Sequence, residues 1–477
     1  MASVTTEQYR SKAAEGIGNP VLQKALVNLQ DRFGKGTAEA YRQLPEGPDL
    51  RLVAHDIRME AIENLDILLE RLTETVACNG GRVFFAPDAA DAVGYIRQVA
   101  RENKVGRVVK GKSMVSEEIG LNDALMADGI DVVETDLGEY IIQLAGEHPS
   151  HIIAPAIHKT REEIGRLFRD ALGIEYSDDP PTLTQAARKA LREKFLTADM
   201  GITGCNLACA ETGHIAVVSN EGNIRMSATL PRIHVAVMGM ERVIARLEDH
   251  DILLRLLTRG AAAQNMATYV SYIGGPRRPG QADGPEQFHL VVLDNGRSKI
   301  LADPRFREML GCIRCAACLN ICPVYGKIGG HAYGHAYSGP VGAVVTPLLV
   351  GVNRARHLCQ GETLCGACQQ ACPVNIDIPR MLLELRAQLA DGDPQWDVAP
   401  ASPLEKLAYA AWSRVVGQRR LYDWILQISR LLQGMLPKSA AGMIRWLPKP
   451  LSGWTRSRDF PPLAAKSFTQ RYRERNP

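Results

Sequence analysis

Long apolar segments are absent from this 477-residue sequence. The longest apolar run, VGAVVTPLLVGV at 341–352, has 12 residues and contains Pro347, whereas a helix needs about 20 apolar residues to cross a bilayer. The N-terminal stretch MASVTTEQYRSKAAEG has no apolar core of the kind found in a secretory signal. We therefore expect a soluble, cytoplasmic protein in a reducing environment, where disulfides are rare.

A large net charge is also absent, because 56 Lys and Arg stand against 53 Asp and Glu. The resulting net charge of +3 gives no reason to expect nucleic acid as a partner. The charge is unevenly distributed: residues 401–477 hold 14 Lys and Arg and 4 Asp and Glu, which leaves the rest of the chain acidic. Aromatic residues are scarce at 6%, yet all five Trp lie at or after Trp396. This basic, Trp-bearing tail predicts a docking surface for a partner or for the inner face of a membrane.

A dinucleotide-binding fingerprint is missing as well, since no G-x-G-x-x-G pattern opens a strand–helix unit. What remains is ordinary globular composition, with 45% hydrophobic and 23% charged residues. The length is that of about three domains. If the protein takes part in redox chemistry, its electrons must be carried by a group other than a dinucleotide.

Apolar runs and amphipathic stretches alternate between residues 55 and 295. This alternation predicts an α/β domain with a mostly parallel sheet and helices on both faces. A further helix is expected at 240–260. Strands are expected at 81–87, 105–111, 130–135, 151–156, 214–220, 232–239 and 287–294.

The remaining segments have different characters. Residues 1–54 are polar with helical periodicity and predict a helical arm, and 296–390 form a cysteine-rich module. Within that module, residues 341–349 are expected to form a helix that spaces its two halves. Residues 391–403 contain three prolines and read as a linker, and 404–477 form a helical, basic C-terminal extension.

Eight of the eleven cysteines lie between Cys312 and Cys372, which favours metal binding over disulfides. The first run has the spacing C-x2-C-x2-C-x3-C followed by Pro323, the pattern of bacterial ferredoxins that bind [4Fe–4S] clusters. A structural zinc site would need two C-x2-C pairs separated by a longer arm. The members of this first run are Cys312, Cys315, Cys318 and Cys322. Arg314 inside the run would stabilise a reduced cluster if it lies close to it.

The second run is less regular. Cys365, Cys368 and Cys372 match its last three positions, but Glu362 stands where the first cysteine is expected, and Cys359 lies three residues earlier. Either the loop bulges and Cys359 binds iron, or another ligand or an open iron corner completes the cluster. In ferredoxins the fourth cysteine of each run binds the other cluster. That rule gives one cluster Cys312, Cys315, Cys318 and Cys372, and the other Cys322, Cys365, Cys368 and, in the first alternative, Cys359.

Two stretches of the α/β domain are candidate binding or catalytic sites. Lys110, Lys112 and Ser113 lie where a strand meets a helix and could hold an anion, although an ordinary capped turn has the same pattern. Glu211 precedes a Gly and a strand, and it is the candidate acid, base or nucleophile. Glu221 lies in a tight turn and is better explained as a turn residue.

The ordered blocks GKSMVSEEIGLNDAL, GCNLACAETG, NEGNIRMSATLPRIHVAVMGMERV, CIRCAACLNICPVY and LCGACQQACPVNIDIP resemble the lactate utilisation protein B family along nearly the whole chain. The resemblance implies an α/β domain with the fold of glucosamine-6-phosphate deaminases, ribose-5-phosphate isomerases and CoA transferases. It also implies a role in oxidising L-lactate to pyruvate with two partner proteins. One partner is rich in cysteine-based redox motifs, and the other is smaller and shares the α/β domain. The family commonly has three cysteines in its second run, so Cys359 departs from its pattern.

Three hypotheses follow. The first is an electron-transfer subunit with two [4Fe–4S] clusters in a system that oxidises a 2-hydroxy acid. The second is an enzyme of CoA-transferase type with Glu211 as nucleophile and clusters that are structural or regulatory. The third is an assembly scaffold without turnover of its own.

Overall fold

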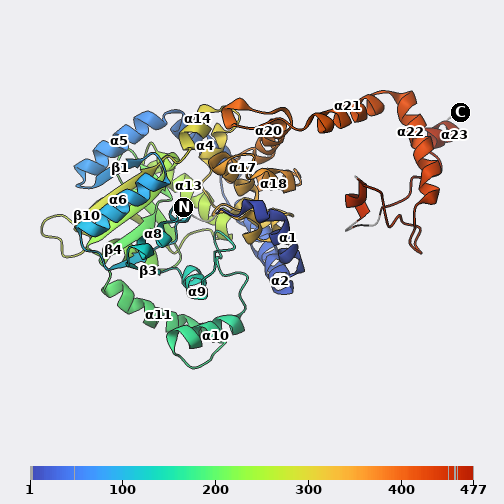
Figure 1. Cartoon of the computed structure of the whole chain (residues 1–477). Coiled ribbons are helices and arrows are strands. Elements are labelled where there is room, and N and C mark those ends of the chain that lie inside the picture. The colour runs from blue at the N-terminus through green and yellow to red at the C-terminus, as the bar shows by residue number, and fades with distance from the viewer. Residues whose placement is uncertain (1–3, 48, 450, 456–457, 459, 476–477) are drawn as a thin grey trace. The chain divides into compact units, whose positions relative to one another are not determined.

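Helices and strands alternate between residues 65 and 293, within the range 55–295 where the apolar pattern predicts them (Figure 1). The computed structural model describes residues 4–47, 49–449, 451–455, 458 and 460–475. The chain divides into two compact units, Met1–Ala399 and Pro400–Pro477, and each is described by itself.

The first unit contains a six-stranded sheet, counted over its described residues, in which every neighbouring pair of strands is parallel. This confirms the predicted parallel α/β sheet. Its strands in spatial order are β1 (Arg82–Ala86), β10 (Gln287–Leu293), β7 (Ile233–Gly239), β4 (Met200–Gly204), β2 (Arg107–Lys110) and β3 (Asp131–Glu134). After β2 the chain continues to β3 on one side, whereas from β4 it continues to β7 on the other side. The strand order therefore reverses between β2 and β4.

Helices and a second sheet cover the two faces of this parallel sheet. One face packs on α6 (Ala89–Glu102), α7 (Met114–Glu118) and α8 (Leu121–Ala127). The other face packs on α5 (Leu65–Cys78), α12 (Asn223–Thr229) and a smaller mixed sheet. Near β2 and β3 it is covered by α9 (Leu137–Ala145), α10 (Arg161–Leu172) and α11 (Pro180–Leu196). The smaller sheet has the order β8 (Val243–Ile244), β5 (Leu207–Cys209), β6 (Ile215–Ser219) and β9 (Tyr269–Ile273).

Two of the predicted elements are wrong. Residues 151–156 form bends and turns instead of a strand, because the His151 Nδ1 atom accepts the backbone N–H groups of Ile153 and Ala154 and Pro155 follows. The helix expected at 240–260 is α13 and begins only at Glu248, ending at Ala262. Residues Met240–Arg242 form a 3-10 turn, and β8 then pairs in parallel with β5. The pattern also gave no indication of β4, whose Gly201 and Gly204 interrupt its apolar run.

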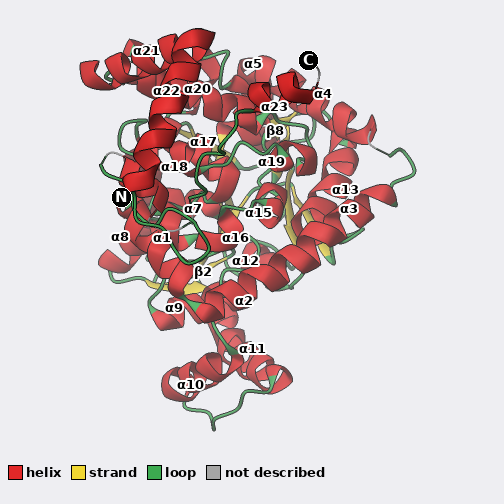
Figure 2. Ribbon diagram, turned by 90° about the vertical axis from the view of Figure 1, so that its right-hand side faces the viewer, coloured by secondary structure: helices red, strands yellow, loops and turns green. Residues whose placement is uncertain are grey.

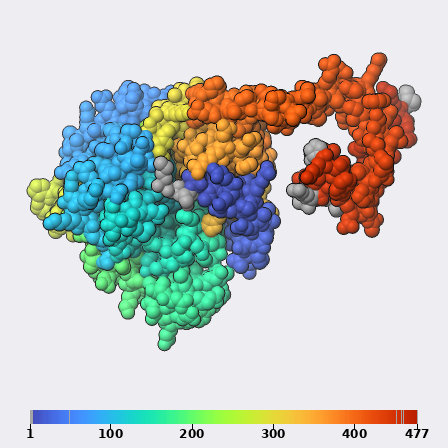
Figure 3. All heavy atoms as spheres, viewed as in Figure 1, coloured from blue at the N-terminus to red at the C-terminus, as the bar shows by residue number. Residues whose placement is uncertain are grey.

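The N-terminal segment is helical, as predicted, and it lies against the cysteine-rich module (Figure 3, dark blue beside orange). Its helices are α1 (Tyr9–Gly18), α2 (Pro20–Leu29), α3 (Lys35–Arg42) and α4 (Asp49–Glu63). Asn19 caps α2 by accepting the N–H groups of Val21 and Leu22, at 3.0 and 3.1 Å. Leu22 and Leu26 then face one core together with residues of the module.

The module itself is built of helices packed around a buried one, α17 (Gly339–Val350), which confirms the helix expected between the two cysteine runs. The others are α14 (Arg297–Ala302), α15 (Ala317–Ile321), α16 (Tyr325–Ile328), α18 (Arg356–Gly361), α19 (Ala367–Ala371) and α20 (Ile378–Asp391). Trp396 lies near the C-terminal end of the first unit. Its ring is buried, and its Nε1 donates to Asp303 at 2.8 Å.

The second unit contains α21 (Pro403–Gly417), α22 (Arg419–Leu432) and α23 (Phe468–Arg475). The first two confirm the helical patterns expected there. They leave Leu407, Trp412, Trp424 and Leu431 exposed within this unit. Over the described part of the chain, no helix combines the length and the apolarity required to cross a membrane.

The packing of β4 gives a testable prediction. A Cβ atom on Gly201 would lie 1.7 Å from the Ser227 carbonyl oxygen, so Gly201→Ala must push α12 off the sheet. We expect a loss of about 1–3 kcal/mol in the free energy of unfolding, measured by urea denaturation. Gly94→Ala is the matched control, because nothing lies within 4 Å of that position in the exposed middle of α6. It should stabilise the protein slightly, and an equal loss in both variants would contradict the packing argument.

Candidate functional site

The two cysteine runs repeat the same backbone conformation at a distance of 50 residues. Arg314 and Leu364 have φ of 57° and 56°, and Ala316 and Gly366 have φ of 65° and 82°. Left-handed residues turn each loop back on itself before a short helix, α15 or α19. The repeat continues through Cys322 and Cys372, which end the two helices with φ, ψ of −71°, 122° and −69°, 120°. α15 and α19 lie side by side (Figure 2).

The repeat also relates Cys312 to Glu362. Each residue directly follows a helix, η4 (Arg307–Gly311) or α18, in an extended conformation with φ of −61° or −77°. Glu362 therefore takes the backbone position in the second loop that Cys312 takes in the first. Cys359 lies one turn earlier, inside α18.

One group of thiols is drawn from both runs. Burial raises the pKa of Cys315, and the neighbouring Cys372 and Cys312 raise it further. Burial also raises the pKa of Cys318, with Cys312 and Cys315 as the next contributors. Cys372 comes from the second run, so these thiols meet in the crossed arrangement expected of a two-cluster ferredoxin.

The other group contains Cys322, Glu362, Cys365 and Cys368. The Cys322 Sγ atom lies 3.5 Å from Glu362 Oε2, and Tyr333 Oη donates to Glu362 Oε1 at 3.0 Å. Burial raises the pKa of Cys368, and Glu362 is the next contributor. Glu362 is a buried carboxylate, and it lines the same small hollow as these three cysteines.

Cys359 belongs to neither of these two groups. It is fully buried, and its thiol donates to the carbonyl oxygen of Arg356 within α18, at 3.3 Å. Burial raises its pKa to about 11, opposed mainly by Arg386, and no cysteine contributes to the shift. The Arg386 guanidinium binds the carbonyl oxygens of Cys359 and Glu362, which fixes this stretch of chain.

The thiols fit ligation of anionic clusters. Backbone N–H groups of Arg314, Tyr325 and Ile376 donate to the Sγ atoms of Cys312, Cys322 and Cys372, each at 3.4 Å. Such donors favour a negative charge on sulfur. Among the described residues, no three His, Cys, Asp or Glu converge closely enough to hold a single metal ion.

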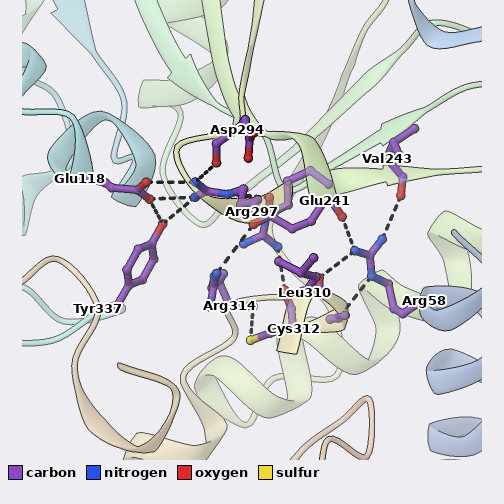
Figure 4. Close-up of polar contacts among 12 residues, drawn as sticks. Arg58, Glu118, Glu241, Val243, Asp294, Arg297, Leu310, Cys312, Arg314 and Tyr337 are labelled. Carbon is purple, nitrogen blue, oxygen red and sulfur yellow. Dashed lines mark hydrogen bonds and ion pairs between the residues drawn. The ribbon is translucent and has the colours of Figure 1, made fainter. Parts of the chain in front are cut away.

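A buried charge network adjoins Cys312 (Figure 4). Arg297 is its hub: Nε binds Glu241 Oε2 and Nη2 binds Glu118 Oε2, both at 2.8 Å. Tyr337 Oη also donates to Glu118, at 2.6 Å. Burial alone would raise the pKa of Glu118, but Arg297 and these hydrogen bonds lower it to about 2.

Three more arginines join this network around the first cysteine loop. Arg58 donates to the carbonyl oxygens of Glu241, Val243, Leu310 and Gly311, and Arg242 donates to that of Cys312 at 3.1 Å. Arg314 stacks over the Tyr337 ring, with 4.6 Å from Cζ to the centroid. All four guanidinium groups are buried, and two carboxylates offset them. The surplus of positive charge is suited to a neighbouring anionic cluster.

A cavity of about 380 Å³ lies between this loop and the parallel sheet. Its sheet side is lined by Lys112 and Ser113 after β2, by Gly204 at the end of β4 and Asn206 beyond it, and by Arg242 after β7. On the opposite side it is lined by residues 313–315 and Tyr337. It therefore lies at the carboxyl ends of the strands, where the strand order reverses. Open α/β sheets bind their ligands at such points.

The proposed anion-binding residues are separated by the fold. Lys112 and Ser113 line the cavity, but Lys110 is buried in an ion pair with Glu134, with 2.9 Å between Nζ and Oε1. Ser113 also caps α7 by accepting the N–H of Ser116 at 3.3 Å, which is the ordinary capped turn considered above. The strand boundary explains the separation: Lys110 is the last residue of β2 and is paired with Glu134 on the adjacent strand β3, whereas Lys112 lies beyond the end of the strand.

The acidic candidates are placed differently from the expectation. Glu211 is exposed, accepts the N–H of Leu247 at 3.0 Å, and is not among the cavity-lining residues. Its catalytic role stays a prediction. Glu221 does line the cavity, and burial, followed by Asp136, raises its pKa to about 7. Sequence reasoning gave no sign of Arg242 or Tyr337 as site residues, because neither belongs to a motif.

The charge network gives a second prediction. Arg297→Gln leaves Glu118 and Glu241 buried without their main counter-charge, which should cost about 3–5 kcal/mol of stability at pH 7. The pKa of Glu118 is lowered in the folded protein, so its stabilising effect is present above pH 4.5 and is lost as the pH falls toward 2. Urea denaturation at pH 7 measures the loss. Arg354→Gln, which breaks an exposed pair with Glu7, should cost under about 1 kcal/mol; similar losses would count against the network.

The chain matches three family models: the LUD domain over residues 69–293, the 4Fe-4S dicluster domain over 308–376, and "Lactate utilisation protein B, C-terminal" over 394–477. A solved structure of a DUF162 family protein from Deinococcus radiodurans aligns with 48% of this chain and 98% of its own, at 15% identity and a TM-score of 0.27.

Curated relatives extend the similarity to the whole chain. A lactate utilization protein B from Bacillus licheniformis is 43% identical over 99% of this chain and 98% of its own. Proteins of the same name from Bacillus subtilis and Macrococcus caseolyticus are each 42% identical, over 99% and 96% of this chain and 97% and 95% of their own. The chain therefore belongs to the lactate utilization protein B family, and it is an iron–sulfur protein of lactate utilisation.

Proposed function

We propose that this chain is the electron-transfer subunit of a multi-protein system that oxidises L-lactate to pyruvate. The observation that carries the proposal is the pair of thiol groups, built from two crossed cysteine runs within one module. Bound [4Fe–4S] clusters would each accept one electron, so two of them match the two electrons that lactate releases. The relatives' name supplies lactate as the substrate of the system.

The cluster ligands follow from the two groups. One cluster is held by Cys312, Cys315, Cys318 and Cys372. The other is held by Cys322, Cys365 and Cys368, with Glu362 at the fourth corner. Glu362 is preferred to Cys359 because it occupies the backbone position of Cys312 and its carboxylate already lies beside Cys322. A carboxylate is a harder ligand than a thiolate, so this corner should be the more labile one.

The partners are proposed on the family resemblance. They are a cysteine-rich redox protein and a smaller protein with the same α/β domain, together with this chain in the cytoplasm. The second unit, 400–477, would provide the docking surface, since it is basic and its helices expose Trp412 and Trp424. The same surface could hold the complex peripherally at the inner face of the membrane.

The fourth ligand is tested by iron content and EPR of anaerobically reconstituted protein. We expect about eight irons per wild-type chain, an unchanged spectrum for Cys359→Ser, and an altered second-cluster signal for Glu362→Ala. Glu362→Cys restores the regular cysteine spacing and should retain both clusters with greater resistance to oxygen. If Cys359→Ser alters the second cluster while Glu362→Ala does not, Cys359 is the ligand.

The electron-transfer role is tested in the complex with both partners. Adding L-lactate anaerobically should produce the EPR signals of reduced clusters in this chain, and Cys315→Ser should remove one of them and lower the iron content. The same measurement with D-lactate and with glycolate shows which 2-hydroxy acid the complex oxidises. Clusters that stay oxidised with all three acids, in a complex that still forms pyruvate, would refute the role.

A further inference from the structure

The cavity beside the first cysteine loop shares one residue, Cys315, with the proposed cluster ligands. It lies at the carboxyl ends of the adjacent strands β2 and β4. The chain after β2 passes close to the end of β4, since a Cβ on Gly204 would lie 3.1 Å from Ser113 Oγ. Its volume of about 380 Å³ lies in the range of small-molecule sites. Position in the sheet and size both indicate a ligand site.

The cluster loop forms one wall of this cavity. Ile313, Arg314 and Cys315 are consecutive in the sequence, and all three line it. Cys315 belongs to the thiol group assigned to the first cluster, so a molecule in the cavity would lie against a cluster ligand. Such a position suits a molecule that exchanges electrons with that cluster.

The charges on the wall select an anion. Lys112, Arg242 and Arg314 line the cavity, and Lys112 forms no ion pair or hydrogen bond with any residue that the structure describes. Two carboxylates also line the cavity, but both are engaged with backbone amides. Asp136 accepts the N–H groups of Gly138 and Glu139, and Glu221 accepts that of Leu137.

The remaining lining decides what kind of anion fits. Side chains such as Ile152, Val217 and Leu257 make much of the wall apolar, while Asn206, Ser219 and Asn223 offer neutral hydrogen-bonding groups. An inorganic anion would leave the apolar surface unused. A carboxylic acid with a carbon body and a second oxygen uses all three kinds of surface.

We infer that this cavity binds a small organic acid of the 2-hydroxy or 2-oxo class, with its carboxylate paired with Lys112. The inference deepens the proposed function and rests on it for the identity of the acid. It assigns the substrate or product site to this chain, next to its first cluster.

The test measures binding of pyruvate and L-lactate to the full-length chain with reconstituted clusters, by calorimetry and by the EPR line shape of the dithionite-reduced protein. Lys112→Gln should weaken binding about tenfold or more, because a charge-assisted hydrogen bond is lost. Ala262→Phe, at the end of α13, should abolish binding by filling the cavity. The iron content should stay unchanged in both variants.

Lys189→Gln is the matched control, since it makes the same chemical change on the exposed surface of α11, and it should bind like wild type. Wild-type affinity in both Lys112→Gln and Ala262→Phe would overturn the inference. Inorganic phosphate that binds as tightly as pyruvate would overturn the choice of an organic acid.

The two proposals fail in different ways. If lactate reduces the clusters in the complex but this chain binds neither acid, the cavity inference fails and the electron-transfer role stands. Suppose instead that this chain binds the acids and that Lys112→Gln weakens this binding, but that the clusters stay oxidised in the active complex. The electron-transfer role then fails and the binding site stands.

Discussion

Burial of negative charge on sulfur is the constraint on which the rest of the first unit depends. Thiolates and cluster charge are costly in a low-dielectric interior unless cations and N–H donors surround them. Here the cations come from four separate parts of the chain: Arg58 from α4, Arg242 after β7, Arg297 from α14 and Arg314 from the cysteine loop. The two carboxylates that offset this charge, Glu118 and Glu241, lie after β2 and β7. The network therefore joins the α/β sheet to the cysteine module.

This joint has a consequence for the sheet. The carboxyl ends of β2, β4 and β7 face the module because the network holds the module there, so the usual ligand position of an α/β sheet becomes a cavity beside the first cysteine loop. Ile152 and Ile153 also line the cavity. They can do so because they bend around His151 instead of adding a strand to the sheet.

The sequence was most informative where spacing reflects local chemistry. The cysteine runs, the parallel sheet and the helices α17, α21 and α22 followed from patterns of fewer than twenty residues. The features that it could not reveal depend on contacts between residues far apart in the chain. β8 has two residues and exists only because β5 lies beside it. Lys110 and Lys112 read alike in the sequence, but Glu134 on the adjacent strand β3 takes the first into the interior. Glu362 could be proposed as a ligand from the spacing, but its preference over Cys359 required the backbone repeat.

The same repeat makes the two centres unequal. Position 314 is a buried arginine in the first loop, whereas the equivalent position 364 is a leucine. Position 312 is a cysteine, and its equivalent is Glu362. The first centre is thus surrounded by cations and adjoins the cavity, while the second has one exposed cysteine, Cys365. On the proposed function, the inner centre meets the small molecule and the outer one lies where another protein can reach it. Such a division lets one module connect a substrate site to a partner without bringing the two into contact.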